Sequence, residues 1–331
     1  MTRGIVRLCF AGAAISLAEP SAALAVEGGA GFYLLGSKGS LAGVVPPPGI
    51  YLQSDDYFYS GDAGISGNGS AQQAFPIGGI VAAGVEADAY YKIGTTLWVL
   101  PDTVLGGNLG LSASVVGGWK DVSASLIIEP LGGIALQDDN TAFGDPVLAA
   151  MLGWHRGNWH WNVGTMINVP IGQWEEGRLA NLGFNRWAVD LNSAVTWLDP
   201  ASGFEISGVI GVTLNFENPD TDYKSGTELH LEFAAVQNLS KRSALGVAGY
   251  HYDQVSGDSG SGARLGAFEG RVTAIGPLAK YTFDVGDTHL SSNLRWFAEF
   301  DTENRLEGHA AILTLSMPYP ALTRLQKPPY R

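Results

Sequence analysis

The chain has little charge and no segment suited to a membrane-spanning helix. Asp, Glu, Lys and Arg make up 15% of the 331 residues, whereas there are 45 glycines and 16 prolines. Few charges and many turn-forming residues favour short strands joined by turns over helices. The uncharged stretch 103–119 contains five glycines, which make it a poor helix. If this protein crosses a membrane, it does so with strands.

Cysteine is almost absent, because the sequence holds only Cys9. That residue lies in a segment with the pattern of a secretory signal peptide: a basic start, an apolar run at 8–17 and the small-residue site Ala23-Leu24-Ala25. The run is too short for a transmembrane anchor, which needs about 20 apolar residues. We expect residues 1–25 to be removed as a cleaved signal peptide. The mature chain then has no cysteine, which excludes disulfides, thiolate metal sites and cysteine catalysis.

Basic residues are scarce as well. There are 19 Lys and Arg against 32 Asp and Glu, which gives a formal net charge of −13, and no run of Lys or Arg forms a basic patch. This composition excludes nucleic acid as a partner.

The segment 26–79 is rich in glycine and proline and shows no periodicity. Its three consecutive prolines fix the backbone and lack N–H groups, which predicts a stiff, polyproline-like spacer. We interpret the segment either as a surface strap or as a plug folded into a barrel interior. The candidate gate or plug residues are Pro46, Pro47, Pro48, Gly49, Tyr51, Tyr57 and Tyr59. We expect them to touch inward-facing side chains such as Glu228 or Arg295.

From residue 80 onward, apolar and polar residues alternate as they do in strands with one oily and one polar face. The pattern is clearest at 187–197, 204–217 and 228–239. We predict an all-β fold with twelve strands, at 80–98, 109–118, 122–136, 146–155, 158–170, 186–198, 203–216, 227–238, 243–255, 267–283, 289–300 and 306–317. A secreted β-sandwich is the alternative that the alternation alone leaves open.

The connections between these strands alternate in length. The longer ones hold Asp138-Asp139-Asn140, Trp174-Glu175-Glu176, 218–226 and 257–262, and the shorter ones hold Lys120-Asp121, Arg156-Gly157, 199–202, Lys241-Arg242 and Gly286-Asp287. Outer-membrane barrels have this asymmetry and an even strand count. We therefore predict a transmembrane antiparallel outer-membrane β-barrel over 80–319, with fourteen strands as the alternative to twelve, and a tail at 320–331.

Two tryptophans give this prediction a length scale. Trp187 and Trp197 lie on one strand face, about 33 Å apart along the strand, which spans about 25 Å of membrane normal at a tilt of about 40°. That is the spacing of two aromatic girdles. In a soluble sandwich the same residues would fill a core.

Several motifs resemble those of one outer-membrane family. They are Glu27-Gly28-Gly29, Pro46-Pro47-Pro48-Gly49-Ile50-Tyr51, Phe143-Gly144-Asp145-Pro146, Asn215-Phe216-Glu217-Asn218-Pro219, Gly226-Thr227-Glu228-Leu229-His230 and Ile275-Gly276-Pro277-Leu278. They run through nearly the whole mature chain and resemble the family associated with the meta-pathway of phenol degradation. The resemblance implies a barrel similar to hydrophobic-compound channels, which help aromatic or other apolar compounds cross the outer membrane. It implies no catalytic residues.

Polar residues on the predicted inner face are the candidates for a ligand pathway, because charges that line a pore tune what it passes. They are Asp190, Asn192, Glu205, Glu228, His230, Glu232, Arg271, Arg295, Glu299 and His309. We expect Arg271 to share its inward face with Glu269, Arg295 with Glu299, and His309 with Glu307. Glu228, His230 and Glu232 form the best candidate metal cluster, but polar barrel walls carry such residues without a metal, and we predict none.

Signatures of catalysis are missing from the sequence. It has no Gly-x-Ser-x-Gly motif, and the glycine-rich stretch 64–69 lacks the Lys-Ser/Thr pair of a phosphate loop. Only His289 with Ser291 would suit a barrel lipase. The sequence predicts a non-enzymatic outer-membrane channel, surrounded by membrane lipid, for passive uptake of small hydrophobic or aromatic compounds without a cofactor. The alternative is a barrel that transports nothing and binds a partner through its long loops.

Overall fold

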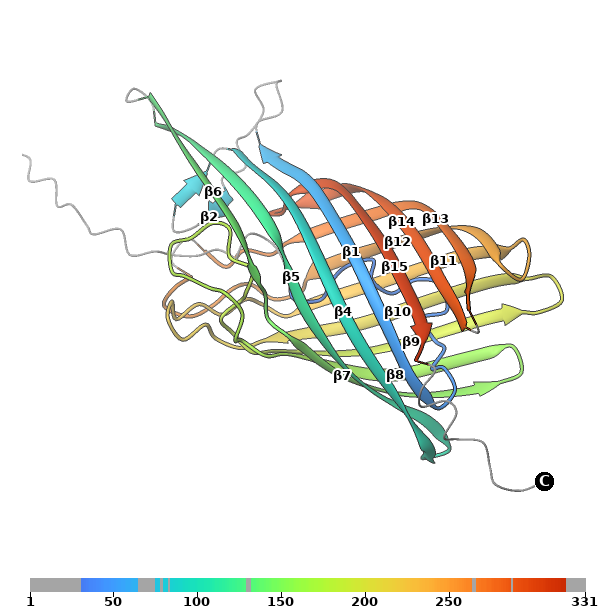
Figure 1. The fold of residues 1–331 in the computed structure, drawn as a ribbon. Helices are drawn as coiled ribbons and strands as arrows, with labels where there is room; N and C mark the ends of the chain where they lie inside the picture. Colours follow the sequence, from blue (N-terminus) through green and yellow to red (C-terminus); the bar gives the residue numbers. More distant parts are fainter. Residues whose placement is uncertain are drawn as a thin grey trace, which may run out of the picture.

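The computed structural model describes residues 31–64, 75–77, 80–82, 84–128, 132–263, 266–286 and 288–319. Twelve antiparallel strands form a closed barrel, because β4 and β5, at the two ends of the strand order, also pair with each other (Figure 1). The ring runs β4 (Gly84–Val104), β1 (Gly49–Gly64), β15 (Glu307–Pro318), β14 (Thr288–Glu303), β13 (Arg271–Val285), β12 (Ser243–Gln254), β11 (Glu228–Asn238), β10 (Phe204–Asn215), β9 (Ala188–Asp199), β8 (Trp159–Asn168), β7 (Val147–Arg156) and β5 (Gly107–Ile128).

Three further strands lie outside this ring. β6 (Gly132–Phe143) pairs with the long-loop half of β5, from Gly117 to Ile128. β2 (Phe75–Ile77) and β3 (Ile80–Ala82) form a separate two-stranded sheet. In the described part of the chain, no helix is long and apolar enough to cross a membrane. The predicted signal peptide and the tail at 320–331 lie outside the described residues.

The predicted number of barrel strands is confirmed, but the two strands predicted at 109–118 and 122–136 have the wrong boundaries. β5 continues through Lys120 and Asp121, where a turn was predicted, because both residues pair with β4 and β6 there. Asp138, Asp139 and Asn140 accordingly belong to β6 and not to a loop.

The predicted plug region supplies the missing strand. Gly49–Gly64 forms β1, which pairs along its length with β15 on one side and β4 on the other. The interpretation of Gly49, Tyr51, Tyr57 and Tyr59 as part of a plug is therefore wrong: they are barrel wall. Leu52, Asp56 and Phe58 alternate with Asp55 and Tyr57, so the segment has the period of a strand, although its outward face is too polar to stand out in the sequence.

The two ends of the barrel differ as the loop lengths predicted. Short turns join β4 to β5, β7 to β8, β9 to β10, β11 to β12 and β13 to β14 at one end. Long connections at 169–187, 216–227 and 255–270 gather at the other end (Figure 1). β1 begins and β15 ends at the short-turn end, so both ends of the barrel wall lie on that side.

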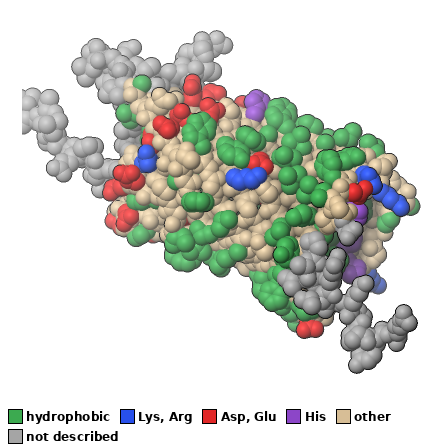
Figure 2. All heavy atoms as spheres, viewed as in Figure 1, with side chains coloured by type: hydrophobic (Ala, Val, Ile, Leu, Met, Phe, Trp, Pro, Cys, Tyr) green, Lys and Arg blue, Asp and Glu red, His purple; other side chains and the backbone are tan. Residues whose placement is uncertain are grey.

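The alternation of side chains gives the wall an apolar outside and a largely polar inside. In β10, Glu205, Ser207 and Thr213 are buried, whereas Phe204 and Ile206 are exposed. Figure 2 shows hydrophobic side chains spread over the visible wall and most of its acidic side chains near the long-loop end. Such a surface matches the apolar band of an outer-membrane barrel.

Candidate functional site in the barrel interior

Eight of the ten predicted pathway residues face the barrel interior. They are Asp190, Asn192, Glu205, Glu228, His230, Glu232, Arg295 and Glu299. Arg295 and Glu299 share an inner face as expected, but they bind different partners: Glu299 accepts hydrogen bonds from the hydroxyls of Tyr59 (2.9 Å) and Tyr250 (2.7 Å).

Arg271 and His309 face outward, so their placement in the pathway is wrong. Arg271 is paired with Glu303 (3.1 Å) and Asp301 (3.6 Å) at an exposed strand end, and His309 stacks on the outward Trp296. The expected neighbours Glu269 and Glu307 are exposed too. These residues lie near the long-loop end, where charge on the outer face is solvated and no longer indicates the inner face.

Residues 31–48, which we call the inner segment, contact inward side chains of six strands. Because this segment belongs to no strand, its backbone needs hydrogen-bond partners from elsewhere. Glu205 of β10 accepts from the Leu41 N–H (2.6 Å) and from the Ser40 hydroxyl (2.9 Å). Lys280 of β13 donates to the same Ser40 hydroxyl (2.8 Å) and lies 3.9 Å from the Glu205 carboxylate.

The same pattern continues on the two strands that follow β10 in the ring, β9 and β8. Asn162 of β8 donates to the Ala42 carbonyl (2.8 Å), and the Gly43 N–H donates to the Thr196 hydroxyl of β9 (2.9 Å). Gly43 must be small, because a Cβ there would lie 2.5 Å from backbone atoms of β8 and β9. The inner segment is therefore pressed directly against the wall at the short-turn end.

Arg295 holds the middle of the inner segment. Its guanidinium donates to the carbonyls of Gly36 (2.8 Å) and Ser37 (2.6 Å), and it also donates to the Thr314 hydroxyl of β15 (2.5 Å). Thr314 in turn donates to the buried Asp55 of β1 (2.6 Å). The buried cation is thus offset by carbonyl oxygens and by a nearby carboxylate, as a buried charge requires.

A second polar cluster surrounds His230. Its Nε2 lies 2.7 Å from Asp190, which also accepts from Asn192 (2.6 Å) and Thr213 (2.9 Å). Lys38 of the inner segment donates to Asn192 at 2.5 Å. The cluster joins β9, β10 and β11 to the inner segment by direct contacts.

The first residues of the inner segment pack against this cluster. Tyr33 stacks on the His230 ring, with ring centroids 3.6 Å apart. The Gly36 N–H donates to Glu232 (3.2 Å), and Gly31 lies against the Glu228 carboxylate. Contact with Glu228 and Arg295 was expected of the gate residues Pro46 to Tyr59, but it is residues 31–37 that make the direct contacts.

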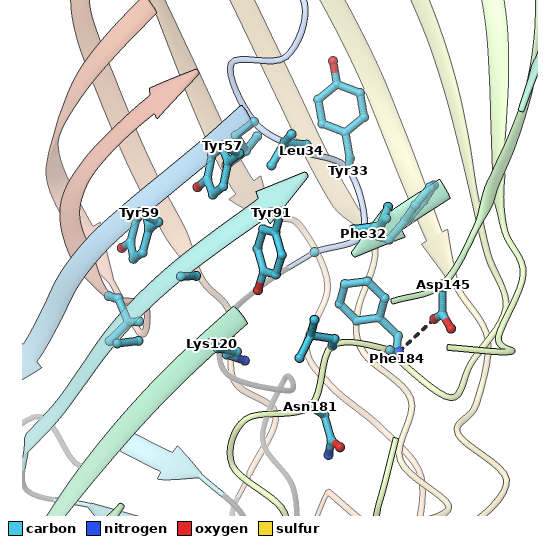
Figure 3. Close-up of a pocket in the computed structure, with 18 of the residues that line it drawn as sticks. Phe32, Tyr33, Leu34, Tyr57, Tyr59, Tyr91, Lys120, Asp145, Asn181 and Phe184 are labelled. Atoms are coloured by element: carbon cyan, nitrogen blue, oxygen red, sulfur yellow. Dashed lines mark hydrogen bonds between the residues drawn. The ribbon is translucent and has the colours of Figure 1, made fainter. Parts of the chain in front are cut away.

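Toward the long loops, the interior opens into a cavity of about 230 Å³. We call it the aromatic cavity, because Tyr57, Tyr59, Tyr91, Tyr250, Tyr252, Phe32, Phe184 and Trp174 line it (Figure 3). Ala87, Ala89 and Val116 add apolar surface, while Lys120, Arg178, Glu299 and Arg305 supply the charges. Arg305 stacks over the Tyr252 ring at 4.1 Å, so its charge is partly turned toward an aromatic face.

The long connection 169–187 folds over the cavity and closes part of its mouth. Ala180 is fully buried against Val85, Ala87 and Val122 of the inner wall. Arg178 binds Asp138 of β6 at 3.2 Å, and Asp145 accepts from the N–H groups of Gly172 and Phe184. The predicted loop containing Trp174 is thus part of the cavity wall.

The family model described as "Putative MetA-pathway of phenol degradation" matches residues 60–315. The chain belongs to this family. An outer membrane channel from Pseudomonas putida F1 has a similar structure, with a TM-score of 0.64 and 17% identity over 83% of this chain and 97% of that chain. At this identity the similarity shows a shared fold.

Other solved barrels are more distant from this phenol-degradation family member. A FadL homologue from Pseudomonas aeruginosa has a TM-score of 0.38 and 10% identity over 82% of this chain and 90% of that chain. The transport unit of the autotransporter AIDA-I from Escherichia coli has a TM-score of 0.41 and 9% identity over the same shares. No curated protein matches the chain.

The remaining sequence candidates lie apart from the interior site of this family member. His289 is exposed at a short turn, where its Nδ1 lies 2.9 Å from Asp284, and Arg242 binds the same carboxylate. Within the described ranges, no group of three His, Cys, Asp or Glu side chains is arranged to hold a metal ion. The aromatic cavity was missed in the sequence because its lining comes from strands and loops spread over more than 250 residues.

Proposed function

We propose that this protein is a passive channel that carries small hydrophobic or aromatic compounds across the outer membrane. The observation that supports it most strongly is the aromatic cavity, a space inside a closed barrel whose walls are mostly rings and aliphatic side chains. Apolar walls with a few polar groups are typical of sites for small ligands. Such a cavity favours a solute of similar character over an ion, because ions lose their hydration there.

The inner segment is the gate in this proposal. A solute enters from the long-loop end, occupies the aromatic cavity and meets Phe32, Tyr33 and Leu34 of the inner segment. Beyond them, the contacts of Glu205, Arg295 and Asn162 hold residues 36–43 in the path. These contacts are hydrogen bonds, and water can replace them when the segment shifts, at a net cost of about 0.5–1.5 kcal/mol for a neutral bond and about 1.5–3 kcal/mol for a bond to a charged group.

The proposed location follows from the wall and from the N-terminal sequence. Residues 1–25 would direct export and be cleaved, and the apolar outer face would be covered by membrane lipid. No cofactor or energy source is part of the proposal, so the direction of net movement follows the concentration gradient of the solute.

Uptake by cells at limiting solute concentration tests the proposal. We expect deletion of the gene to slow uptake of benzene-ring compounds and of apolar solutes of similar size, and we expect uptake of a small sugar to be unchanged. Complementation with the intact gene should restore the rate. Equal uptake with and without the gene, over a panel of such solutes, would contradict the transport proposal.

A second function, a barrel that does not transport, is favoured by one observation. The inner segment contacts inward side chains of six strands, from β8 to β14, and so fills interior space from His230, near the long loops, to Asn162, near the short turns. In that case the long loops would bind a partner outside the cell. Liposomes loaded with an aromatic dye separate the two functions, since dye release that depends on the folded protein occurs only with transport.

A further inference from the structure

The outer wall formed by β1 and β4 carries a charged pair. Asp56 and Lys92 lie opposite each other on these strands, and Lys92 Nζ is 2.8 and 2.9 Å from the two carboxylate oxygens. The Tyr90 hydroxyl donates to the same carboxylate at 2.7 Å. The Lys92 side chain is still 51% exposed. Figure 2 shows acidic and basic atoms side by side in the middle of this face.

Aromatic side chains put this pair at membrane depth. Trp98, which is 49% exposed, lies six residues from Lys92 along β4, and Tyr90 lies two residues away on the other side. At about 3.4 Å per residue, these separations are about 20 Å and about 7 Å along the strand. Because aromatic girdles mark the two interfaces of a barrel, Lys92 and Asp56 lie between the girdles on the outward face.

Lipid chains are a poor surrounding for such a pair. A lysine on the lipid face of a barrel costs about 2–4 kcal/mol at the midplane and about 0–1 kcal/mol near the interfaces, and Lys92 lies nearer the interface marked by Tyr90 than the midplane. The bond to Asp56 lowers this cost, but a half-exposed ammonium group still faces hydrocarbon. Because the pair is neutral overall, it also offers no net charge to hold an anionic lipid headgroup. A polar protein surface would cover it better than lipid does.

Several residues around the pair are small or carry hydroxyl groups, and the exposed Phe58 and Val115 lie on the same outward face. Ser54, Gly94, Thr96 and Gly117 share its outward face. Small residues allow two membrane-spanning elements to approach closely. The wall of β9 and β10 is different, because it presents Leu191, Val195, Ile206, Ile210 and Leu214 to the outside. Among these outward side chains β9 and β10 carry no charge, whereas the wall of β1 and β4 carries the Asp56–Lys92 pair, which a protein partner would cover.

We propose that β1 and β4 form an interface between two copies of this chain in the membrane, related by a two-fold axis. A two-fold contact places the same patch of each copy against the other, so the patch must complement itself. One anion beside one cation meets this condition, since each Asp56 can approach Lys92 of the second copy. The four charges then neutralise one another away from lipid.

Crosslinking in native outer membranes tests the interface. The variants Ser54→Cys and Ser193→Cys are made in a Cys9→Ser background and treated with a short bifunctional maleimide. Both positions face outward, but Ser193 lies on β9. We expect Ser54→Cys to give about tenfold more crosslinked dimer, a ratio that corresponds to about 1.4 kcal/mol. Equal yields, or a product that contains a different protein, would overturn the proposal.

Charge variants give an independent measurement on folded protein. We expect Asp56→Lys to reduce the crosslinked Ser54→Cys dimer strongly, because it brings four cations together across the interface. The double variant Asp56→Lys/Lys92→Asp should restore the dimer, since it keeps one charge of each sign. The heat-dependent gel shift of a folded barrel identifies variants that fail to fold. A folded Asp56→Lys variant with undiminished dimer would overturn the role of the pair.

Discussion

The two halves of the barrel interior are built on different chemistry. In the short-turn half, buried polar side chains such as Glu205, Arg295 and Thr196 are bound to the inner segment. In the long-loop half, tyrosines and aliphatic side chains surround a cavity of about 230 Å³. The short-turn half is filled and polar, whereas the long-loop half holds the partly empty, mostly apolar cavity beside the buried cluster of Asp190 and His230.

This difference separates two tasks that a selective channel needs. A cavity lined by rings favours apolar solutes by removing them from water, at roughly 25 cal/mol for each Å² of apolar area buried. A polar filling is held by hydrogen bonds, which contribute little net free energy when water can replace them. The long-loop half is therefore suited to select a solute, and the short-turn half to open and close behind it.

Deletion of most of the inner segment should have the largest effect. Deletion of residues 31–45 leaves β1 intact and exposes the polar inner wall of β8 to β14 to water. We expect the ion conductance in planar bilayers to rise severalfold, because the interior becomes a continuous polar pore. The gel shift on heating controls for folding. A folded deletion variant with unchanged conductance would show that the inner segment does not block the path.

Filling the cavity should have the next largest effect. Ala89 faces the aromatic cavity from β4, and Ala89→Phe would add a ring to it. We expect release of an aromatic dye from liposomes to fall about tenfold, equivalent to about 1.4 kcal/mol, with no change in ion conductance. The matched control is Ser193→Phe, which adds the same ring to the outer face of β9. Equal dye release from both variants would mean that the cavity is off the route.

A smaller effect is expected when one hydrogen-bond partner of the inner segment is removed. Glu205→Ala removes the acceptor of the Leu41 N–H and the carboxylate nearest Lys280. A buried group left without its partner costs about 1–3 kcal/mol, so the inner segment should be cleaved faster by added protease, while the barrel stays folded. The control Glu217→Ala changes an exposed glutamate just beyond β10. Unchanged cleavage would show that contacts other than those of Glu205 keep the inner segment in place.

The smallest effect concerns the turn at Gly36. Its φ is +76°, and a Cβ there would lie 2.6 Å from the Phe297 ring. A left-handed conformation costs a residue with a side chain about 1–2 kcal/mol, so Gly36→Ala should make the inner segment exchange its amide hydrogens faster. Ser37→Ala serves as the control. Identical exchange in both variants would show that the turn does not fix the position of the segment.

Local patterns in the sequence were enough to predict the wall over most of its length. The alternation at 187–197, 204–217 and 228–239 gave the correct inward and outward faces, because successive side chains of any strand point to opposite sides. The same rule failed for Arg271 and His309, which lie where the outer face leaves the apolar band. The short turn at 199–202 was predictable because turn chemistry is local.

Only the tertiary structure decided the role of the N-terminal region. Gly49–Gly64 became β1 because its backbone pairs with β15, about 260 residues away, and such pairing leaves little trace in a strand whose outward face carries Ser54 and Asp56. The Lys120-Asp121 pair did not form a turn, since β4 and β6 supplied partners for a continuous strand. The inner segment has no periodic pattern, and side chains 120 or more residues away hold it in place.

The sequence by itself therefore determined which faces of the strands point inward and outward, because these faces depend on neighbouring residues. The closure of the wall and the position of the inner segment depended on contacts that form only when distant parts of the chain meet.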